Sequence, residues 1–496
     1  MTGERITNDG PESGATVDRK QRGAWFTPTH LVDALVAAVV TGEFVERRRR
    51  RPIHVIDPAC GDGRFLVAVR AAVEAHGGDV RLVGVDVDAA TVAAIDPSCG
   101  IHVIRADALR DGRLDDVRPR EGFDIVIGNP PYLSQMAAAT TRGGSSVRGG
   151  GPYMDAAAEF LALGSELVDP DGGRLAYVLP QSILSARDAG DVRRNIDDRA
   201  TMFWSAWTGE RDFAAQVVTC AVAFEFSPTA AASLAASSTG NWSHVVTARS
   251  GVPALASVFE HPEPAAGRLG DRVRLNANFR DEYYGMVPAV GDFLFGPPLI
   301  TSGLIDPGRS LWGERSVRFA KRRFTAPRID VAALDEKMTR WAEQRLVPKV
   351  LIANQTSILE AVCDPLGEWL PGVPVVAAYP LDVTSGAEVA WQVAAVLTSP
   401  AASVWAWHQR GGTGLGPTAI RVGPTMLAEL AWPEGSLDDA VDALRAGDVI
   451  RCGELVDAAF GLTADEHAAA MAWWCSALDR IGERSRSHPV RDANLC

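Results

Sequence analysis

Short apolar runs alternate with amphipathic stretches along the first half of the chain. The runs at residues 53–56, 81–85, 101–104 and 123–127 have the length and continuity of strands buried on both faces. Apolar residues at helical spacing follow the first run, from residue 64 onward. Alternating strands and helices are typical of a doubly wound, mostly parallel sheet, which binds ligands outside the carboxyl ends of its strands. The pattern therefore predicts an α/β domain with its site at that edge.

The second half of the chain has a different pattern. Residues 229–265 are rich in Ala, Ser, Thr and Pro and are interpreted as a linker. After them, the pattern of apolar residues predicts strands at 347–356 and 366–376 and helices at 389–397 and 436–481. This half therefore predicts a separate, mixed α+β domain.

These patterns divide the chain into five segments. Residues 24–228 are predicted to form the α/β domain, and residues 266–481 the second domain with a helical C-terminal part. The other segments are a tail at 1–23, the linker at 229–265 and a second tail at 482–496.

The composition is typical of a globular protein, with 47% hydrophobic and 22% charged residues. No apolar run is long enough to span a bilayer, and the polar first 21 residues lack the apolar core of a secretory signal. The seven cysteines form no Cys-x-x-Cys pair, and the nine histidines lack metal-ligand spacing. We therefore expect reduced thiols, a cytoplasmic protein, no metal site and no membrane partner.

The net charge of −13 argues mildly against a nucleic-acid partner, but charge is unevenly distributed. Residues 315–328 carry six basic residues and no acid, with aromatic residues between them, which suits contact with phosphates. A solvated helix face or loop is the alternative. The arginine run at 46–51 is interpreted as a solvated connector before the first strand, with phosphate contact the less favoured reading.

Acidic residues follow three of the predicted strands. Asp57 comes at the end of the first strand, before a turn that contains Gly61 and Gly63, and it would repel a pyrophosphate. The turn is neither a dinucleotide fingerprint nor a phosphate-binding loop, and its carboxylate suits an amine-bearing ligand such as the methionine part of S-adenosylmethionine. Asp86 is placed to bind ribose hydroxyls and Asp107 to bind an adenine amine. Each acid, taken alone, could equally be a helix N-cap.

The fourth predicted strand ends in Gly128-Asn129-Pro130-Pro131-Tyr132. The Asn129 side-chain oxygen and the Pro130 carbonyl can both accept hydrogen bonds from one NH2 group, and the two prolines fix the backbone that carries them. Tyr132 can stack on a flat ring. The motif therefore suits a planar, amine-bearing substrate, with an ordinary Pro-rich turn as the alternative.

In these motifs the chain resembles the class I S-adenosylmethionine-dependent methyltransferases, and more narrowly the DNA adenine-N6 methyltransferases of bacterial restriction–modification systems. Trp25-Phe26-Thr27-Pro28 resembles the segment that closes over the methionine moiety, and its position before the cofactor turn matches the gamma group. The resemblance implies a Rossmann-like domain with a mostly parallel seven-stranded sheet, and a C-terminal target-recognition domain. The cofactor contacts that it implies are Phe26, Thr27, Pro28, Asp57, Pro58, Ala59, Cys60, Gly61, Gly63, Asp86, Asp107 and Asn129.

The resemblance further implies catalytic roles for Asn129, Pro130, Pro131 and Tyr132, and stacking of Phe213 on the target base. A core aromatic at a strand start is an equally good interpretation of Phe213. The implied reaction is site-specific methyl transfer to the N6 amine of a flipped adenine in duplex DNA. The alternatives are an RNA or protein-glutamine methyltransferase with the same grip, and an inactive DNA-binding or scaffold subunit.

The basic and amide residues of the second domain are the candidates for DNA contact, because arginine can read guanine and Asn or Gln can read adenine. They are Arg318, Lys321, Arg322, Arg323, Lys349, Asn354 and Gln355. Only a short polar tail precedes Phe26 and no nuclease cluster is evident, so a restriction endonuclease or defence-system partner is expected to be a separate chain.

Overall fold

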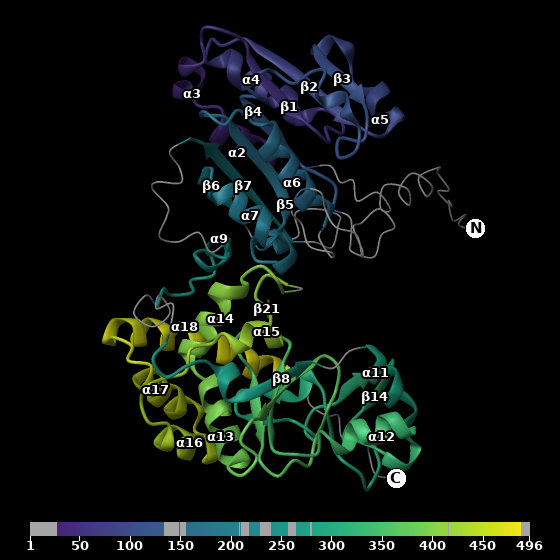
Figure 1. Cartoon of the computed structure of the whole chain (residues 1–496), viewed down its shortest axis with the longest axis vertical. Coiled ribbons are helices and arrows are strands. Elements are labelled where there is room, and N and C mark those ends of the chain that lie inside the picture. Colours follow the sequence, from purple (N-terminus) through teal and green to yellow (C-terminus); the bar gives the residue numbers. More distant parts are fainter. Residues whose placement is uncertain are drawn as a thin grey trace, which may run out of the picture. The chain divides into compact units, whose positions relative to one another are not determined.

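The computed structural model describes residues 27–132, 148, 155–207, 209, 218–228, 240–255, 264–277, 280–414 and 416–487. The chain divides into two compact units, Met1–Val245 and Val246–Cys496 (Figure 1).

The first unit contains a seven-stranded sheet in the order β3-β2-β1-β4-β5-β7-β6. The first five strands of that order pair in parallel, and β7 pairs antiparallel with both β5 and β6. The strands are β1 Ile53–Asp57, β2 Val80–Asp86, β3 Ile101–Arg105, β4 Ile125–Gly128, β5 Arg174–Pro180, β6 Ala200–Ala206 and β7 Thr219–Phe226. The predicted mostly parallel seven-stranded sheet is confirmed.

Helices cover both faces of this sheet. Apolar side chains of α2 and α4 share one core with alternate residues of the central strands, such as Val55, Ile127 and Val178. On the other face, Gly164 lets α6 approach β5, since a Cβ there would lie 2.7 Å from Leu175 Cδ1 and 2.9 Å from the Tyr177 hydroxyl. The helices of this unit include α2 Thr29–Val39, α3 Gly42–Arg47, α4 Arg64–Ala75, α5 Ala89–Ala94, α6 Ala156–Leu167 and α7 Gly190–Asp197.

The amino ends of the central strands are joined by a buried ion cluster. Asp124, fully buried just before β4, accepts hydrogen bonds from Arg48 Nε at 2.6 Å, Arg51 Nη1 at 2.6 Å and the His54 backbone N–H at 2.9 Å. Burial alone would raise the pKa of Asp124, but the bonds from Arg51, His54 and Arg48 outweigh it and hold that pKa below its usual value. The predicted solvated role of residues 46–51 is therefore wrong for Arg48, whose side chain is 10% exposed. Arg51 is exposed, as predicted, but it also binds Asp124, so both arginines tie the sequence before β1 to β4.

The first unit extends beyond the predicted boundary at residue 228. Trp242 is buried, its ring lies 4.9 Å from that of Phe224 in β7, and its indole N–H donates to Asp197 Oδ1 at 2.8 Å. This side chain returns to the sheet after a stretch whose composition resembles a linker. The predicted linker therefore begins too early.

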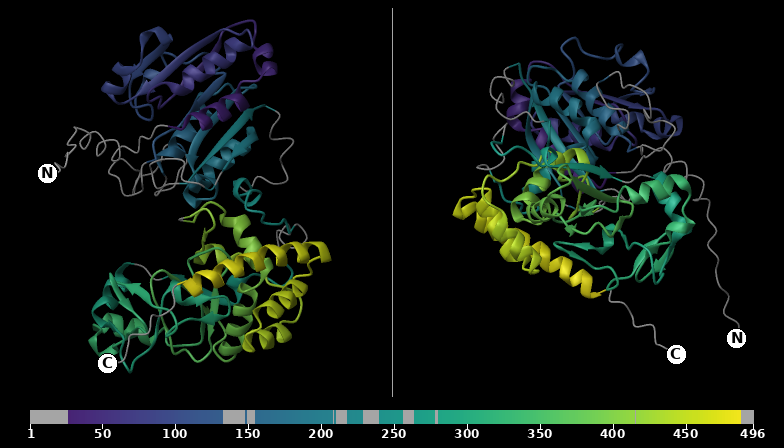
Figure 2. Two further views of the ribbon diagram at one scale, coloured as in Figure 1. Left: turned by 180° about the vertical axis from the view of Figure 1, so that it is seen from behind. Right: turned by 60° about the horizontal axis from the view of Figure 1, so that its bottom comes forward.

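The second unit is built on a four-stranded antiparallel sheet in the order β18-β16-β20-β8. Helix α13 packs on this sheet, and the long helix α18 packs along α14 and α17 (Figure 2). The strands are β8 Val273–Ala277, β16 Lys349–Ala353, β18 Ala361–Asp364 and β20 Val375–Pro380, and the helices are α13 Gly386–Leu397, α14 Pro400–Arg410, α16 Asp438–Arg445, α17 Val449–Ala459 and α18 Ala464–Ser487. The predicted mixed α+β character is confirmed.

Short strands in the same unit form a second core around Phe319, Phe324, Trp341 and Met286. The contributing elements are α11 Arg280–Met286, β9 Val290–Gly291, β10 Leu299–Ile300, β13 Val317–Phe319, β14 Arg322–Phe324, β15 Arg328–Ile329, α12 Glu336–Glu343 and β19 Leu370–Pro371. Of the predicted strand 366–376, the chain forms β19, which pairs with β10, and the start of β20, which pairs with β16.

Across the described ranges, no single helix is long and apolar enough to cross a membrane, and α13 and α14 meet that test only together, as a pair bent by 67°.

Replacing Asp124 tests the buried ion cluster. Asp124→Ala removes the closest carboxylate from the guanidinium of Arg48, whose side chain is 10% exposed, and leaves it only Asp169 at 3.9 Å. Because such a loss uncovers a buried charge, we expect the free energy of unfolding to fall by about 3 kcal/mol in urea titrations. Glu46→Ala, which breaks the exposed pair with Arg49, is the control and should change it by less than about 0.5 kcal/mol. Equal losses in the two variants would contradict this account.

Candidate functional site

Asp57 lies at the carboxyl end of β1 and is 1% exposed. Its Oδ1 accepts a hydrogen bond from the Ala59 backbone N–H at 3.0 Å, which folds the chain back over the strand end. Burial, reinforced by the nearby charges of Asp86 and Asp62 and opposed by the Ala59 hydrogen bond, raises the pKa of Asp57 to about 8. This side chain is therefore poised to ionise when a cation arrives.

The turn after β1 is held by the neighbouring strand. Gly61 donates its backbone N–H to Asp86 Oδ2 at 3.0 Å, and the Cys60 N–H donates to the Val85 carbonyl at 2.8 Å. Gly61 and Gly63 have φ values of +53° and +77°, a conformation that side-chain-bearing residues rarely adopt. These φ values favour glycine at both positions of the turn beside Asp57.

Cys60 packs under this turn and is 4% exposed. Its Sγ lies 2.9 Å from the point where a Cβ on Gly84 would stand, so the glycine within β2 makes room for it. Burial raises the pKa of the Cys60 thiol, which removes it as a nucleophile at neutral pH. The residue supports the turn from below.

The third acid, Asp107, follows β3 and is half-buried. Its Oδ1 accepts from the Leu109 N–H at 3.1 Å, and its Oδ2 lies 3.7 Å from Arg110. The carboxylate thus caps the turn that follows it. Asp57, Asp86 and Asp107 end three adjacent parallel strands, so the structure brings them to one edge of the sheet.

Asn129, directly after β4, is oriented by a residue from the start of the described chain. Its Nδ2 donates to Thr27 Oγ1 at 2.9 Å, and its Oδ1 accepts a hydrogen bond from the Tyr132 hydroxyl. The Tyr132 hydroxyl also lies 3.4 Å from the Val178 carbonyl oxygen. Pro130 is buried, whereas Pro131 and Tyr132 are half-buried.

Thr27 also connects the turn after β1 to the loop after β4. Its carbonyl accepts from the guanidinium of Arg64, which pairs with Asp62 at 2.6 Å. The sequence motif suggested a cofactor contact for Thr27 and Pro28, and the structure adds a link between Thr27 and Asn129. No local pattern announces this link, because the two residues lie 102 positions apart.

Gly128 has a role that the sequence interpretation did not assign. A Cβ at this position would lie 2.4 Å from Asp57 Oδ1 and 2.8 Å from its Cγ. The ends of β1 and β4 therefore meet with Asp57 packed directly against the backbone that carries Asn129. A glycine inside an otherwise apolar strand is the signal that would have found this contact.

Phe26 and Phe213, the two other predicted site aromatics in this unit, lie outside the described residues.

The second unit presents most of the predicted basic residues on a hairpin. Strands β13 and β14 pair antiparallel through a turn in which Ala320 and Lys321 have φ values of +49° and +66°. Phe319 and Phe324 are buried in the core beneath it. The residues exposed on the hairpin are Arg318, Lys321, Arg322 and Arg323, a set that we call the basic hairpin.

The other three predicted DNA contacts differ. Lys349 is fully buried and paired with Asp364, and this removes it from any contact surface, because its ammonium already has its partner inside the sheet. Burial, opposed by the Asp364 charge, lowers the pKa of Lys349. Asn354 uses its Nδ2 to bind the Val422 carbonyl, and Gln355 is half-buried in β17 (Gln355–Thr356).

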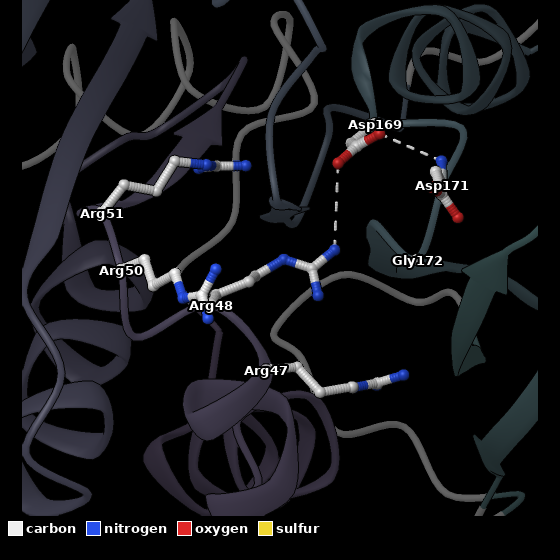
Figure 3. Close-up of a pocket in the computed structure, with 7 residues that line it drawn as sticks. All are labelled: Arg47, Arg48, Arg50, Arg51, Asp169, Asp171 and Gly172. Carbon is white, nitrogen blue, oxygen red and sulfur yellow. Dashed lines mark hydrogen bonds and ion pairs between the residues drawn. The ribbon is translucent and has the colours of Figure 1, made fainter.

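The arginines before β1 line a pocket at the other edge of the sheet, where the strands begin (Figure 3). Arg48 Nη2 lies 3.9 Å from Asp169 Oδ2, and Asp169 accepts from the Asp171 N–H at 3.0 Å. Because Asn129 and Asp57 lie at strand ends, this pocket is separate from them. Among the described residues, no group of three or more His, Cys, Asp or Glu side chains could hold a metal ion.

Comparisons with known proteins agree with the geometry. Residues 12–202 match the family model of N-6 DNA methylases. The chain is similar to Type II methyltransferase M.TthHB8I of Thermus thermophilus, with 38% identity over 81 residues that cover 16% of this chain and 15% of that protein. It is also similar to Type II methyltransferase M.CvrRI of Paramecium bursaria Chlorella virus XZ-6E, with 26% identity over 178 residues that cover 34% of this chain and 39% of that protein. The chain thus spans less than half the length of each relative.

Among solved structures, a type I restriction-modification methyltransferase subunit from Streptococcus thermophilus is 18% identical, with a TM-score of 0.35 over 42% of this chain and 46% of that chain.

Adding a methyl group at Gly128 tests the contact with Asp57. In Gly128→Ala the new Cβ needs the space of the Asp57 carboxylate, so we expect a loss of about 1–3 kcal/mol of unfolding free energy. Gly112→Ala, where no atom lies within 4 Å of the new Cβ, should stay within about 0.5 kcal/mol of the parent. Urea denaturation measures both, and a Gly128→Ala protein as stable as the Gly112→Ala protein would refute the contact.

Proposed function

We propose that this protein, whose residues 12–202 match the family model of N-6 DNA methylases, transfers a methyl group from S-adenosylmethionine to the N6 amine of an adenine in duplex DNA. The observation that carries the proposal is the Asn129 amide, oriented by Thr27 and placed one residue from the Gly128–Asp57 contact. An acceptor for an amine and a carboxylate for a cationic ligand thereby share one edge of the sheet. S-adenosylmethionine, when bound, supplies the electrophilic methyl group.

Asn129 and Pro130 hold the substrate amine in this scheme. With Nδ2 donating to Thr27, Asn129 presents Oδ1 as an acceptor, and the Pro130 carbonyl is the second acceptor. Two hydrogen bonds to one NH2 group draw the nitrogen lone pair out of conjugation with the ring and make it nucleophilic. The protein contributes orientation, and the target base must leave the duplex to reach the site.

Tyr132 must change partner when the substrate binds. Its hydroxyl donates to Asn129 Oδ1, which is the oxygen that the amine needs. The Val178 carbonyl, 3.4 Å from the same hydroxyl, is a ready replacement. This exchange leaves the hydroxyl paired while the tyrosine ring, with Phe213, stacks on the base.

The acidic cofactor turn suits the charge of S-adenosylmethionine, which bears a sulfonium and an ammonium group. Asp86 accepts the backbone N–H of Gly61, and the charges of Asp86 and Asp62 help to raise the pKa of Asp57. We assign the ammonium to Asp57, the ribose hydroxyls to Asp86 and the adenine amine to Asp107. Pro58, Ala59, Gly63 and Pro28 complete the walls of this proposed cofactor site.

We further propose that the protein acts in the cytoplasm as the modification component of a restriction–modification or phage-defence system. Two similar proteins carry the name Type II methyltransferase, and all six cysteines in the described part of the chain are free thiols. An endonuclease would then be a separate partner chain. The basic hairpin, with Gln355 as a further candidate, is the proposed DNA contact of the second unit.

Asn129→Ala tests the proposed function directly. Purified protein is incubated with methyl-labelled S-adenosylmethionine and unmethylated plasmid, and the nucleosides are separated by chromatography. We expect label in N6-methyldeoxyadenosine from the parent and a loss of at least about a hundredfold in Asn129→Ala. Cofactor affinity, measured by calorimetry, should change little, because the methionine end meets Asp57. Label in RNA or protein but not in DNA would overturn the DNA assignment, and undiminished turnover would overturn the role of Asn129.

The pKa of Asp57 predicts a pH dependence of cofactor binding. A carboxylate must be ionised to meet an ammonium, so below its pKa of about 8 binding has to release a proton. The Kd for S-adenosylmethionine should therefore fall by about tenfold per unit between about pH 6 and pH 8, and flatten above. Asp57→Asn should bind more weakly and without this slope. A flat profile in the parent would contradict the assignment of the ammonium to Asp57.

A further inference from the structure

A short loop in the second unit exposes large apolar side chains. Leu294 is 88% and Phe295 is 85% exposed, and among the large apolar side chains of the described residues only Val383, at 87%, is exposed to the same degree. They lie between β9 and β10, whose residues Val290 and Leu299 share a core with α11, α12 and β14. Exposed apolar side chains that are adjacent and project from a loop indicate an interaction site.

The loop is held firmly at both ends. Asp292 accepts hydrogen bonds from the backbone N–H groups of Thr325 at 3.0 Å and Ala326 at 2.9 Å. At the other end, the Gly296 carbonyl accepts from Arg328 at 2.6 Å, and a Cβ on Gly296 would lie 2.3 Å from the Ile329 carbonyl oxygen. Both ends of the loop are thus fixed so that Leu294 and Phe295 project into the solvent.

Phe293, which precedes Leu294, also supports the loop. The ring of Phe293 covers Gly291, where a Cβ would lie 2.4 Å from the ring. Phe293 is 44% exposed, about half the value of its two successors. Phe293 therefore supports Leu294 and Phe295 from beneath. We call Leu294 and Phe295 the apolar tip.

The basic hairpin adjoins the apolar tip. Thr325, which Asp292 holds, directly follows the last residue of β14. In the hairpin, Arg318 and Arg323 stand directly opposite each other across the two strands. Like charges in opposed positions destabilise a strand pair, so an anionic partner would relieve a repulsion that the free protein carries.

We propose that Leu294 and Phe295 insert as a wedge between base pairs of duplex DNA, while the basic hairpin binds the flanking phosphates. The proposal rests on the proposed function, which supplies the duplex. Apolar side chains next to arginines are the combination by which proteins unstack a base step and bend the duplex. Local unstacking also lowers the cost of extruding a target base.

The test measures DNA unwinding, which needs neither the recognition sequence nor catalysis. A nicked plasmid is closed by ligase in the presence of the protein, and the topoisomers are separated on a gel. We expect the parent protein to lower the linking number, because an inserted wedge unwinds the step that it opens. Leu294→Ser/Phe295→Ser should retain at most half of this shift at equal DNA occupancy.

Two variants control the experiment. Val383→Ser removes an equally exposed apolar group from the segment between β20 and α13 and should shift the topoisomers as the parent does. Arg318→Ala/Arg323→Ala should bind plasmid more weakly, with the slope of log affinity against log salt reduced by about two. All four proteins are compared by thermal denaturation, so that a folding defect is recognised.

The outcomes separate the wedge from the proposed function. A parent protein that methylates adenine but causes no topoisomer shift overturns the wedge alone, as does a tip variant that shifts topoisomers fully. A parent that neither binds nor methylates DNA overturns the proposed function instead. Tip-dependent binding to vesicles containing phosphatidylserine, with unchanged DNA unwinding, would assign the surface to a membrane and overturn the wedge.

Discussion

The close approach of Asp57 to the backbone of Gly128 is the constraint on which the site depends. Strands β1 and β4 are paired neighbours, so their carboxyl ends arrive together, and the missing side chain at Gly128 lets the carboxylate fill the space between them. Asn129 takes its position from this junction. The carboxylate loses its water there, which raises its pKa, so the same packing that places the amide also prepares the acid for a cation.

Strand β4, which Asn129 directly follows, is fixed at its two ends by two different kinds of interaction. At its start, the buried Asp124 is paired with Arg48 and Arg51, and the stability of this ion cluster depends on every partner being present. At its end, the constraint is steric. Thr27 then orients the amide plane of Asn129. A reacting group needs such support from a rigid element and from neighbours that leave it one orientation.

The sequence predicts the strands and their polar ends because both signals are local. A buried parallel strand is a continuous apolar run, and the residue after it belongs to the ligand-binding edge. Contacts between distant residues carry no such signal. The sequence alone predicts Lys349 to be an exposed cation, because its partner Asp364 is brought opposite it only by the pairing of β16 with β18. The composition around Trp242 likewise predicts a linker, and only its packing on Phe224 shows that it belongs to the first unit.

Net charge is a poor guide to the partners of this chain, because its charges are segregated by the fold. Asp57, Asp62 and Asp86 lie close together around the turn after β1, whereas the basic hairpin exposes four cations. The overall value of −13 averages these surfaces and describes neither. Since salt screens charges beyond about 10 Å, a partner senses the local set. A protein that binds both a cationic cofactor and a polyanion therefore needs segregation more than it needs a particular net charge.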